Sequence, residues 1–227
     1  MTYEEIVKKQ QKQEIAFSHE FWKQYIELEK LFLETEKYVA INDKNFKTYS
    51  IQYNILLQAI CAEVDVVIKR FCFEFDNTTN IDDMYKYVNF ILLHMPNLVN
   101  KQVNMQLYDL NITPWKGIGF RRNNKGKEFV IPPYWWDGYI KIKHRRITFS
   151  KNDNEYKILE RNMVQANQKN VLGALAGLFV LEIECLNKMR ERFKILFENA
   201  GYPTAEAGLD MFNNSIFQQE LNIFEGF

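Results

Sequence analysis

The stretch YSIQYNILLQAICAEVDVVIKRFC, residues 49–72, has no Gly or Pro and is apolar almost all the way around a helix. A helix of this kind is buried on every side, so we expect residues 49–75 to form the central helix of the protein. Its few polar side chains fall into two narrow stripes. On one of them, Asp65 and Lys69 are four residues apart and can form an ion pair. On the other, Glu63 needs a partner, because an isolated buried charge is costly.

Four further helices are predicted from the helical spacing of apolar residues and from the polar breaks between them. They cover residues 4–40, 81–95, 133–148 and 156–199. The first dozen residues are too polar to bury much, so we expect them to fray or to bind a partner. Asn80 is the expected N-cap of the helix at 81–95, and Pro96 ends that helix. The sequence therefore predicts a mainly α fold, a single helical domain over residues 1–227.

The character of the sequence changes between residues 100 and 131. VNMQLYDL (103–110) and KEFVIP (127–132) have the alternation or the β-branching of strands. The segment that joins them is rich in Gly, Asn and basic residues. We expect a β-hairpin or an irregular insertion here, within the helical domain.

The composition excludes several classes of protein. Twenty-nine Lys and Arg balance 29 Asp and Glu, so any contact with RNA must come from a local patch. The chain has no run of about 18 apolar residues and no signal-peptide pattern at its start, so we expect a cytoplasmic protein without membrane contact. Three cysteines without metal-type spacing and three histidines predict no metal site, and no cofactor is expected.

Cationic and aromatic residues gather in PPYWWDGYIKIKHRR, residues 132–146. If this stretch is a helix, its large apolar side chains share one side and should be buried, because such side chains dominate core energetics. They are Trp135, Trp136, Tyr139 and Ile142. The other side carries Lys141, His144 and Arg145 and should stay open to a ligand.

Two interpretations of this helix stay open. In the first, its charged face is only solvated, and Lys143 or Arg146 pairs with an acidic residue of the central helix, preferably Glu63 and otherwise Asp65. In the second, the cations hold a phosphodiester and His144 acts as general acid or base. Cleavage of RNA in this way needs no metal, since the 2′-hydroxyl of the substrate can be the nucleophile.

A second basic and aromatic patch lies in ITPWKGIGFRRNNKGK, residues 112–127. Aromatic rings stack on bases and Arg or Lys side chains meet phosphates, so this patch is suited to RNA. The candidate RNA contacts are Trp115, Arg121, Arg122, Lys141 and Arg145. An ordinary basic solvent loop is an equally good interpretation of the patch.

The sequence ANQKNVLGALAGLFVLE, residues 166–182, places Ala166, Gly173 and Gly177 close to one helix face. Small residues let another helix approach closely. We expect this face to form the seam of a homodimer; the alternative is packing within one chain.

Four segments together resemble bacterial proteins related to the HEPN superfamily, over about residues 45–185. They are residues 49–72, PWKGIGF (114–120), WWDGYIKIKHRR (135–146) and residues 166–182. The resemblance implies a helical bundle, often dimeric. Many HEPN domains are metal-independent endoribonucleases of toxin–antitoxin, abortive-infection and CRISPR systems, and others are non-catalytic binders.

The HEPN active motif is an arginine that precedes a histidine by a few residues. Only the histidine transfers to this sequence, onto His144, because residues 137–139 are Asp, Gly and Tyr. Lys143, Arg145 or Arg146 is then the candidate for the missing cation, and an acidic residue of the preceding core helix transfers to Glu63. Two functions stay open: a phage-defence or toxin-type endoribonuclease, or a non-catalytic module that binds RNA, a nucleotide or a partner protein such as an antitoxin.

Overall fold

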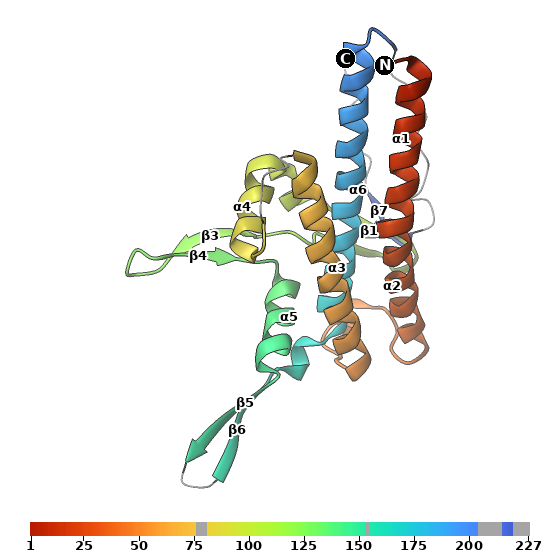
Figure 1. Cartoon of the computed structure of the whole chain (residues 1–227). Helices are drawn as coiled ribbons and strands as arrows, with labels where there is room; N and C mark the ends of the chain where they lie inside the picture. Colours follow the sequence, from red (N-terminus) through yellow and green to blue (C-terminus); the bar gives the residue numbers. More distant parts are fainter. Residues whose placement is uncertain (76–80, 153–154, 204–214, 220–227) are drawn as a thin grey trace.

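The structure is a computed structural model that describes residues 1–75, 81–152, 155–203 and 215–219. The fold is mainly α, as predicted, with small antiparallel β-sheets attached to the helices. The helices are α1 (Tyr3–Phe17), a π-helical turn (Ser18–Trp22), α2 (Lys23–Glu34), α3 (Ile51–Phe75), α4 (Met84–His94), α5 (Tyr134–Arg145) and α6 (Gln168–Asn199). Because α1, the π-helical turn and α2 are continuous, the described residues form five helical rods (Figure 1).

Two rods, α3 and α6, form the centre of the bundle, and the α1–α2 rod lies along α6 (Figure 1). The buried apolar side chains belong to one hydrophobic cluster to which every helix contributes. Among the described residues, α6 is the one helix whose length and apolar composition suit a membrane span. However, 89% of its most apolar stretch is buried within the protein, so the core accounts for this composition.

The α1–α2 rod is shorter than the predicted helix over 4–40, because it ends at Glu34 in a 3-10 turn. Thr2 and Glu5 cap its N-terminus with a reciprocal capping box. Glu14 is buried and accepts hydrogen bonds from Arg190 of α6, with Nε–Oε1 and Nη2–Oε2 distances of 3.1 and 3.2 Å. The first dozen residues bury little, as expected, since Ile6 and Gln10 are the buried side chains among them. They do not fray, however, because the capping box starts a regular helix at Tyr3.

One face of α3 is exposed, which corrects the expectation that this helix is buried on every side. Apart from Gln52, its exposed residues recur at steps of four and three residues and are apolar except for one lysine, as in a helix–helix seam. We call them the α3 stripe: Ile51, Ile55, Ala59, Ala62, Val66, Lys69 and Phe73. The stripe has no covering element among the described residues.

The insertion at 100–131 forms short strands, as predicted. β1 (Val103–Met105) pairs with β2 (Leu110–Ile112) on one side and with β7 (Gln218–Gln219) on the other. β3 (Gly119–Arg122) pairs with β4 (Glu128–Ile131), and this hairpin projects from the bundle (Figure 1).

A second projecting hairpin overturns the start of the helix predicted at 156–199. β5 (Ile147–Asn152) pairs with β6 (Glu155–Arg161), so α5 ends at Arg145 and α6 begins at Gln168 (Figure 1). Both strands are rich in β-branched and aromatic residues, which favour pairing, whereas the lack of Gly and Pro does not specify a helix. The start of α6 is set by Asn167, whose side chain accepts a hydrogen bond from Asn170 N at 3.0 Å.

Residues 215–219 bind across the bundle, a long way from α2 in sequence. The buried Glu29 of α2 accepts hydrogen bonds on Oε2 from Tyr25 Oη (2.5 Å), Ser215 Oγ (2.7 Å) and Ile216 N (3.2 Å). Phe217 is buried next to Phe179 of α6. Burial raises the pKa of the Glu29 carboxyl, although these three donors favour its charged form.

Candidate functional site

The apolar side of α5 is packed into the bundle, which confirms the prediction. Trp135, Trp136, Tyr139 and Ile142 are all buried. With Trp115 of the insertion, the three rings form a ladder of edge-to-face contacts whose successive centroids are 5.3, 6.0 and 5.1 Å apart. This ladder fixes the orientation of α5, and therefore of the charged residues on its other side.

Trp115 cannot stack on a base, so its predicted role in RNA binding is wrong. The side chain is fully buried, and its Nε1 donates a hydrogen bond to Gly177 O at 3.1 Å. Aromatic residues next to basic ones in a sequence indicate an RNA surface only if their rings are exposed. Here the ring joins the insertion to α6.

The small-residue face of α6 is occupied by α5 and does not form a dimer seam. A Cβ atom on Gly177 would lie 2.9 Å from Cζ2 of Trp135, and one on Gly173 would overlap the hydroxyl of Tyr134. Ala166 is buried as well. The prediction of close helix packing at this face is confirmed, but the partner is a helix of the same chain.

α5 ends in an exposed basic cluster that consists of His144 and three cations, Lys143, Arg145 and Arg146. The helix end is fixed by the buried Asn162, which donates from Nδ2 to Arg145 O (2.7 Å) and from its backbone N to Arg146 O (3.0 Å). No carboxylate pairs with any of the four among the side chains that the structure describes. Lys141, one turn earlier, is neutralised by Asp137, with 2.8 Å between Nζ and Oδ2.

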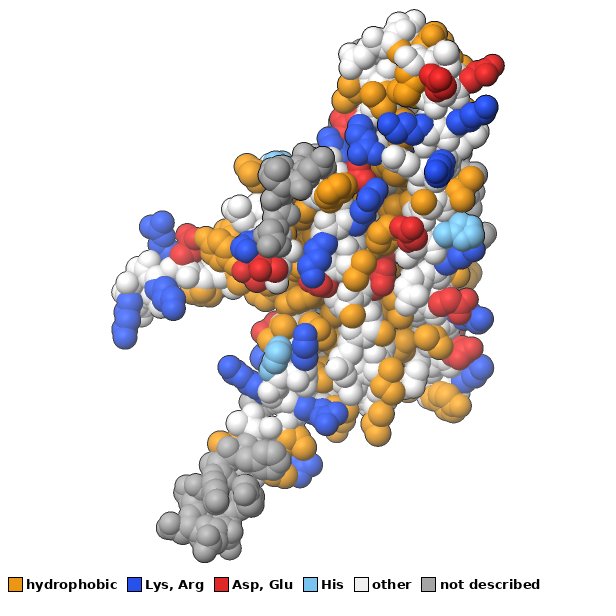
Figure 2. All heavy atoms as spheres, in the orientation of Figure 1, with side chains coloured by type: hydrophobic (Ala, Val, Ile, Leu, Met, Phe, Trp, Pro, Cys, Tyr) orange, Lys and Arg blue, Asp and Glu red, His pale blue; other side chains and the backbone are white. Residues whose placement is uncertain are grey.

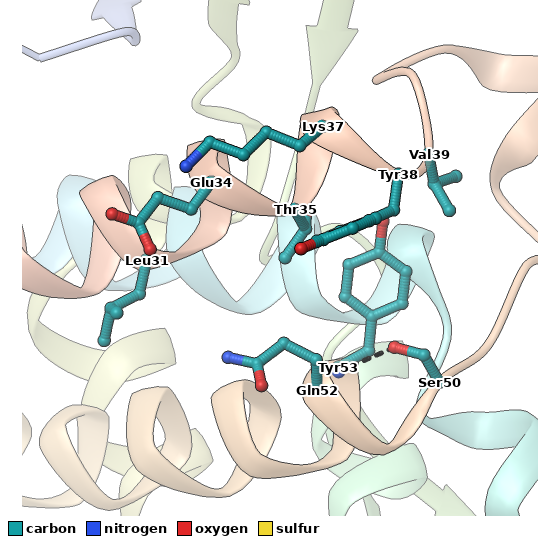
Figure 3. A pocket seen from close by; sticks show the side chains of 9 residues that line it. All are labelled: Leu31, Glu34, Thr35, Lys37, Tyr38, Val39, Ser50, Gln52 and Tyr53. Carbon is teal, nitrogen blue, oxygen red and sulfur yellow. Dashed lines mark hydrogen bonds between the residues drawn. The ribbon is translucent and has the colours of Figure 1, made fainter.

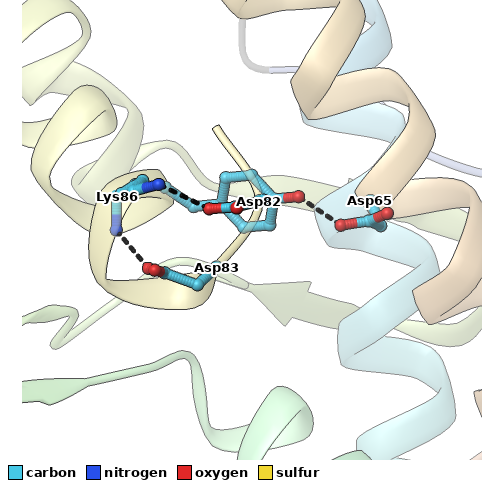
Figure 4. A network of polar contacts seen from close by, with 5 residues as sticks. Asp65, Asp82, Asp83 and Lys86 are labelled. Atoms are coloured by element: carbon cyan, nitrogen blue, oxygen red, sulfur yellow. Dashed lines mark hydrogen bonds and ion pairs between the residues drawn. The ribbon is translucent and has the colours of Figure 1, made fainter. Parts of the chain in front are cut away.

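The predicted ion pair between Glu63 and Lys143 or Arg146 is absent from the described residues. Glu63 is half-buried on α3, and burial raises the pKa of its carboxyl. Asp65, the other candidate, is occupied: Lys69 Nζ lies 2.5 Å from Oδ2, as predicted, and Tyr87 of α4 donates to Oδ1 (Figure 4). The cations of α5 thus face solvent and not the acidic side chains of α3.

A network of acidic groups fixes the start of α4 (Figure 4). The N-cap is Asp83, whose Oδ1 accepts from Lys86 N at 2.9 Å, and Asp82 forms an ion pair with Lys86 Nζ at 2.6 Å. Asn80, which was the predicted cap, lies outside the described residues. The network holds α4 against α3 and carries no free acid for catalysis.

Glu182 of α6 is a buried carboxyl without a partner. Its side chain is fully buried, and neither oxygen has a hydrogen bond or ion pair among the described residues. Burial raises the pKa of Glu182 well above its usual value, and the nearby charge of Glu63 raises it further. Both causes favour the neutral, protonated form of this carboxyl.

The β3–β4 hairpin presents the second basic patch in a fixed shape. Residues 116–127 contain five Lys or Arg and no acidic residue. Asn123 closes the loop, because its Oδ1 accepts hydrogen bonds from Lys125 N (2.9 Å) and Lys127 N (3.0 Å). Gly126 takes the positive φ of 75° that the turn requires.

The two patches belong to the same side of the molecule. In Figure 1, the β3–β4 and β5–β6 hairpins project from the same side of the bundle, with α5 between their bases. Figure 2 shows Lys and Arg side chains at the tip of the β3–β4 hairpin and again around the lower end of α5, with a notch between these two places. We call the exposed cations concerned the basic surface: Arg121, Lys125, Lys127, Lys143, Arg145 and Arg146.

Two pockets lie elsewhere on the chain. One, of about 420 Å³, opens between the end of α2 and the start of α3, where Tyr38 and Tyr53 line it (Figure 3). The other, of about 480 Å³, contains the ion pair between Lys101 and Glu184. Neither includes His144. Within the described part of the chain, no three His, Cys, Asp or Glu side chains are grouped as metal ligands would be.

No family model, curated protein or solved structure matches this chain. The resemblance to HEPN domains therefore stays a prediction from the sequence motifs.

Proposed function

We propose that the protein binds RNA through the basic surface. The single observation that carries this proposal is the local excess of unpaired cations on a chain whose total charge is balanced. Lys143, Arg145 and Arg146 have no acidic partner among the described residues, and the β3–β4 hairpin carries its cations on a closed loop. Cations that are not neutralised by neighbouring carboxylates are available to phosphates.

The alternative explanation is that cations at the end of α5 only stabilise the helix dipole. The cations in the last turn of α5 would stabilise the helix dipole, but this explanation does not account for the second group of cations, on the β3–β4 hairpin. Both groups project to one side of the bundle (Figure 2). A polyanion that spans the notch between them would contact both.

The test is the salt dependence of RNA binding, measured by fluorescence anisotropy. Each phosphate contact contributes about 0.7 to the slope of log affinity against log salt for a single strand. Replacing Lys143, Arg145 and Arg146 together with Gln should lower the slope by about 2. Lys194→Gln, an exposed lysine on α6, is the matched control and should leave the slope unchanged. Binding that is absent or insensitive to salt would overturn the proposal.

A second candidate function is metal-independent cleavage of the bound RNA, as in the phage-defence or toxin-type ribonucleases that the sequence resembles. The exposed imidazole of His144 among three cations favours it, because imidazole exchanges protons near neutral pH. Glu63 is not part of this proposal, since it does not reach the cations. The wild type should cleave RNA in the presence of EDTA, and His144→Ala should lose this cleavage while it still binds RNA. A ribonuclease activity that survives the substitution would refute the proposal.

We also propose that a second copy of the chain covers the α3 stripe. The stripe runs the length of a 25-residue helix, about 37 Å, which is long enough for a standard dimer interface. Ala59 and Ala62 at its centre permit close approach of a second helix, and the larger Ile55 and Val66 flank them. Val66→Glu should convert a dimer to a monomer in analytical ultracentrifugation, whereas Leu159→Glu, an exposed apolar residue on β6, should not. A wild-type monomer at tens of micromolar would refute the interface.

A further inference from the structure

The β3–β4 hairpin has two faces with different surroundings. In its antiparallel register, Phe120 is opposite Val130 and Arg122 is opposite Glu128. Arg121 is opposite Phe129, and this pair lies between the other two. Directly opposed residues share a face and successive residues alternate between faces, so Arg121 and Phe129 lie together on the face that Arg122 does not occupy.

The face that carries Arg122 contacts α4 through Tyr85. Tyr85 of α4 contacts the ring of Phe120, with 4.8 Å between centroids, and its hydroxyl donates to Glu128 at 3.0 Å. Arg122 Nε lies 3.8 Å from Glu128 Oε2. Part of this face therefore packs against protein, and the guanidinium of Arg122, although exposed, has a neighbouring carboxylate. Of the two arginines, Arg122 is for this reason expected to make the weaker contact with RNA.

The other face carries Arg121 and Phe129 without any partner among the described residues. Phe129 is 46% exposed, and Arg121 is exposed next to it. Opposed side chains in a strand pair have Cβ atoms roughly 5 Å apart, close enough for a ring and a guanidinium to act on one ligand. The exposed ring of Phe129 and the exposed guanidinium of Arg121 together offer a ligand an apolar ring face and a positive charge.

We propose that the hairpin binds single-stranded RNA, with one base stacked on the ring of Phe129 and the adjacent phosphate on Arg121. This inference rests on the proposed RNA binding and adds the substrate class. A base in a duplex is already stacked on both sides and offers no face to a side chain, whereas an unpaired base does. Stacking on aromatic rings, with Arg or Lys on the backbone, is how proteins bind single strands without reading the sequence.

The same surface could in principle take a peptide, since a phenylalanine next to an arginine suits an acidic apolar segment. The neighbouring cations favour RNA. Lys125 and Lys127 follow on the same hairpin, and the unpaired cations of α5 lie on the same side of the bundle. A strand of phosphates matches a row of separated positive charges better than a short apolar segment does.

The test compares an unstructured oligouridylate with the duplex that it forms with oligoadenylate, both by fluorescence anisotropy. The wild type should bind the single strand more tightly. Phe129→Leu keeps the apolar volume and removes the ring, and it should weaken single-strand binding by about tenfold with an unchanged salt slope. Phe129→Trp should restore the affinity. Arg121→Ala should weaken binding more than Arg122→Ala, its neighbour on the opposite face, which lies next to Glu128.

Phe129→Trp also gives a direct readout of stacking. The natural tryptophans are all buried, so the substituted side chain would be the exposed indole, and its emission should be quenched by oligouridylate. If the wild type binds no RNA at all, the proposed function fails. If it binds single strand and duplex equally, and Phe129→Leu changes neither, RNA binding stands and the stacking inference is refuted.

Discussion

Replacing Glu182 with Leu should stabilise the protein at neutral pH. The side chain is fully buried on α6, and neither carboxyl oxygen has a partner among the described residues. A buried polar group without a hydrogen bond costs about 1–3 kcal/mol, and leucine of similar size can make the same apolar contacts. We therefore expect Glu182→Leu to raise the free energy of unfolding by roughly this amount. For a chain of this length, each kcal/mol corresponds to about 2–4 °C in Tm.

The pH dependence separates this mechanism from a general gain in hydrophobicity. Burial raises the pKa of the Glu182 carboxyl well above its usual value, with the charge of Glu63 as a second cause. Above the unfolded pKa of about 4.3, the native state keeps a proton that the unfolded state has released. The contribution of this group to stability is thus complete below that pKa and is lost as the pH rises toward the folded pKa. The slope in this window is up to about 1.4 kcal/mol per pH unit.

Glu182→Gln removes the titration and keeps the shape, so its advantage over the wild type should grow with pH. The assay is urea unfolding followed by circular dichroism at constant ionic strength, from about pH 5 to pH 8. Glu198→Gln, an exposed glutamate on the same helix, is the matched control and should run parallel to the wild type. The reasoning would be refuted if the wild type were more stable than Glu182→Leu at every pH. It would also be refuted if the difference in unfolding free energy between Glu182→Gln and the wild type did not change with pH.

Three further predictions concern packing and ion pairs, each measured as a change in the free energy of unfolding. Gly177→Val should cost about 1–3 kcal/mol because its side chain enters the aromatic ladder, whereas Gly119→Ala, which meets no atom within 4 Å, should be nearly neutral. Arg190→Ala should cost about 3 kcal/mol because it removes the ion pair that Arg190 makes with the buried carboxylate of Glu14. Phe217→Ala should cost about 3–5 kcal/mol, since the ring is buried and its loss leaves a cavity under the C-terminal segment.

Periodicity was sufficient to predict the helical rods and the buried side of α5. It could not place their ends, because those depend on single side chains such as the Asn167 cap and on the pairing of β5 with β6. Strand pairing depends on contacts between two segments. The sequence of one segment shows that it is apolar but does not show whether it pairs with another strand. The helix predicted at 156–199 was wrong in its first part for this reason.

Of the cations in the proposed site, Arg121, Lys143, Arg145 and Arg146 were named from the sequence, whereas Lys125 and Lys127 were missed. The aromatic group named from the sequence, Trp115, is buried. An exposed cation needs no partner, so the chain position of Arg145 or Arg121 was enough. A pairing such as that expected for Glu63 depends on the distance between two helices, which sequence spacing does not contain. The exposed ring of Phe129 could have replaced Trp115 as the stacking candidate. Only the register of the hairpin distinguishes this exposed ring from the buried aromatic rings.

The contact between Glu29 and the segment at 215–219 has a consequence for synthesis of the protein. Ser215 is 186 residues beyond Glu29. A ribosome that adds about 5–20 residues per second makes that length of chain in roughly 10–40 s. Throughout this interval, the newly made α2 carries a carboxylate whose two distant hydrogen-bond donors do not yet exist. A nascent chain that stalls before this segment emerges therefore exposes the groove that Phe217 fills, and would be a target for chaperones and proteases that a finished chain escapes.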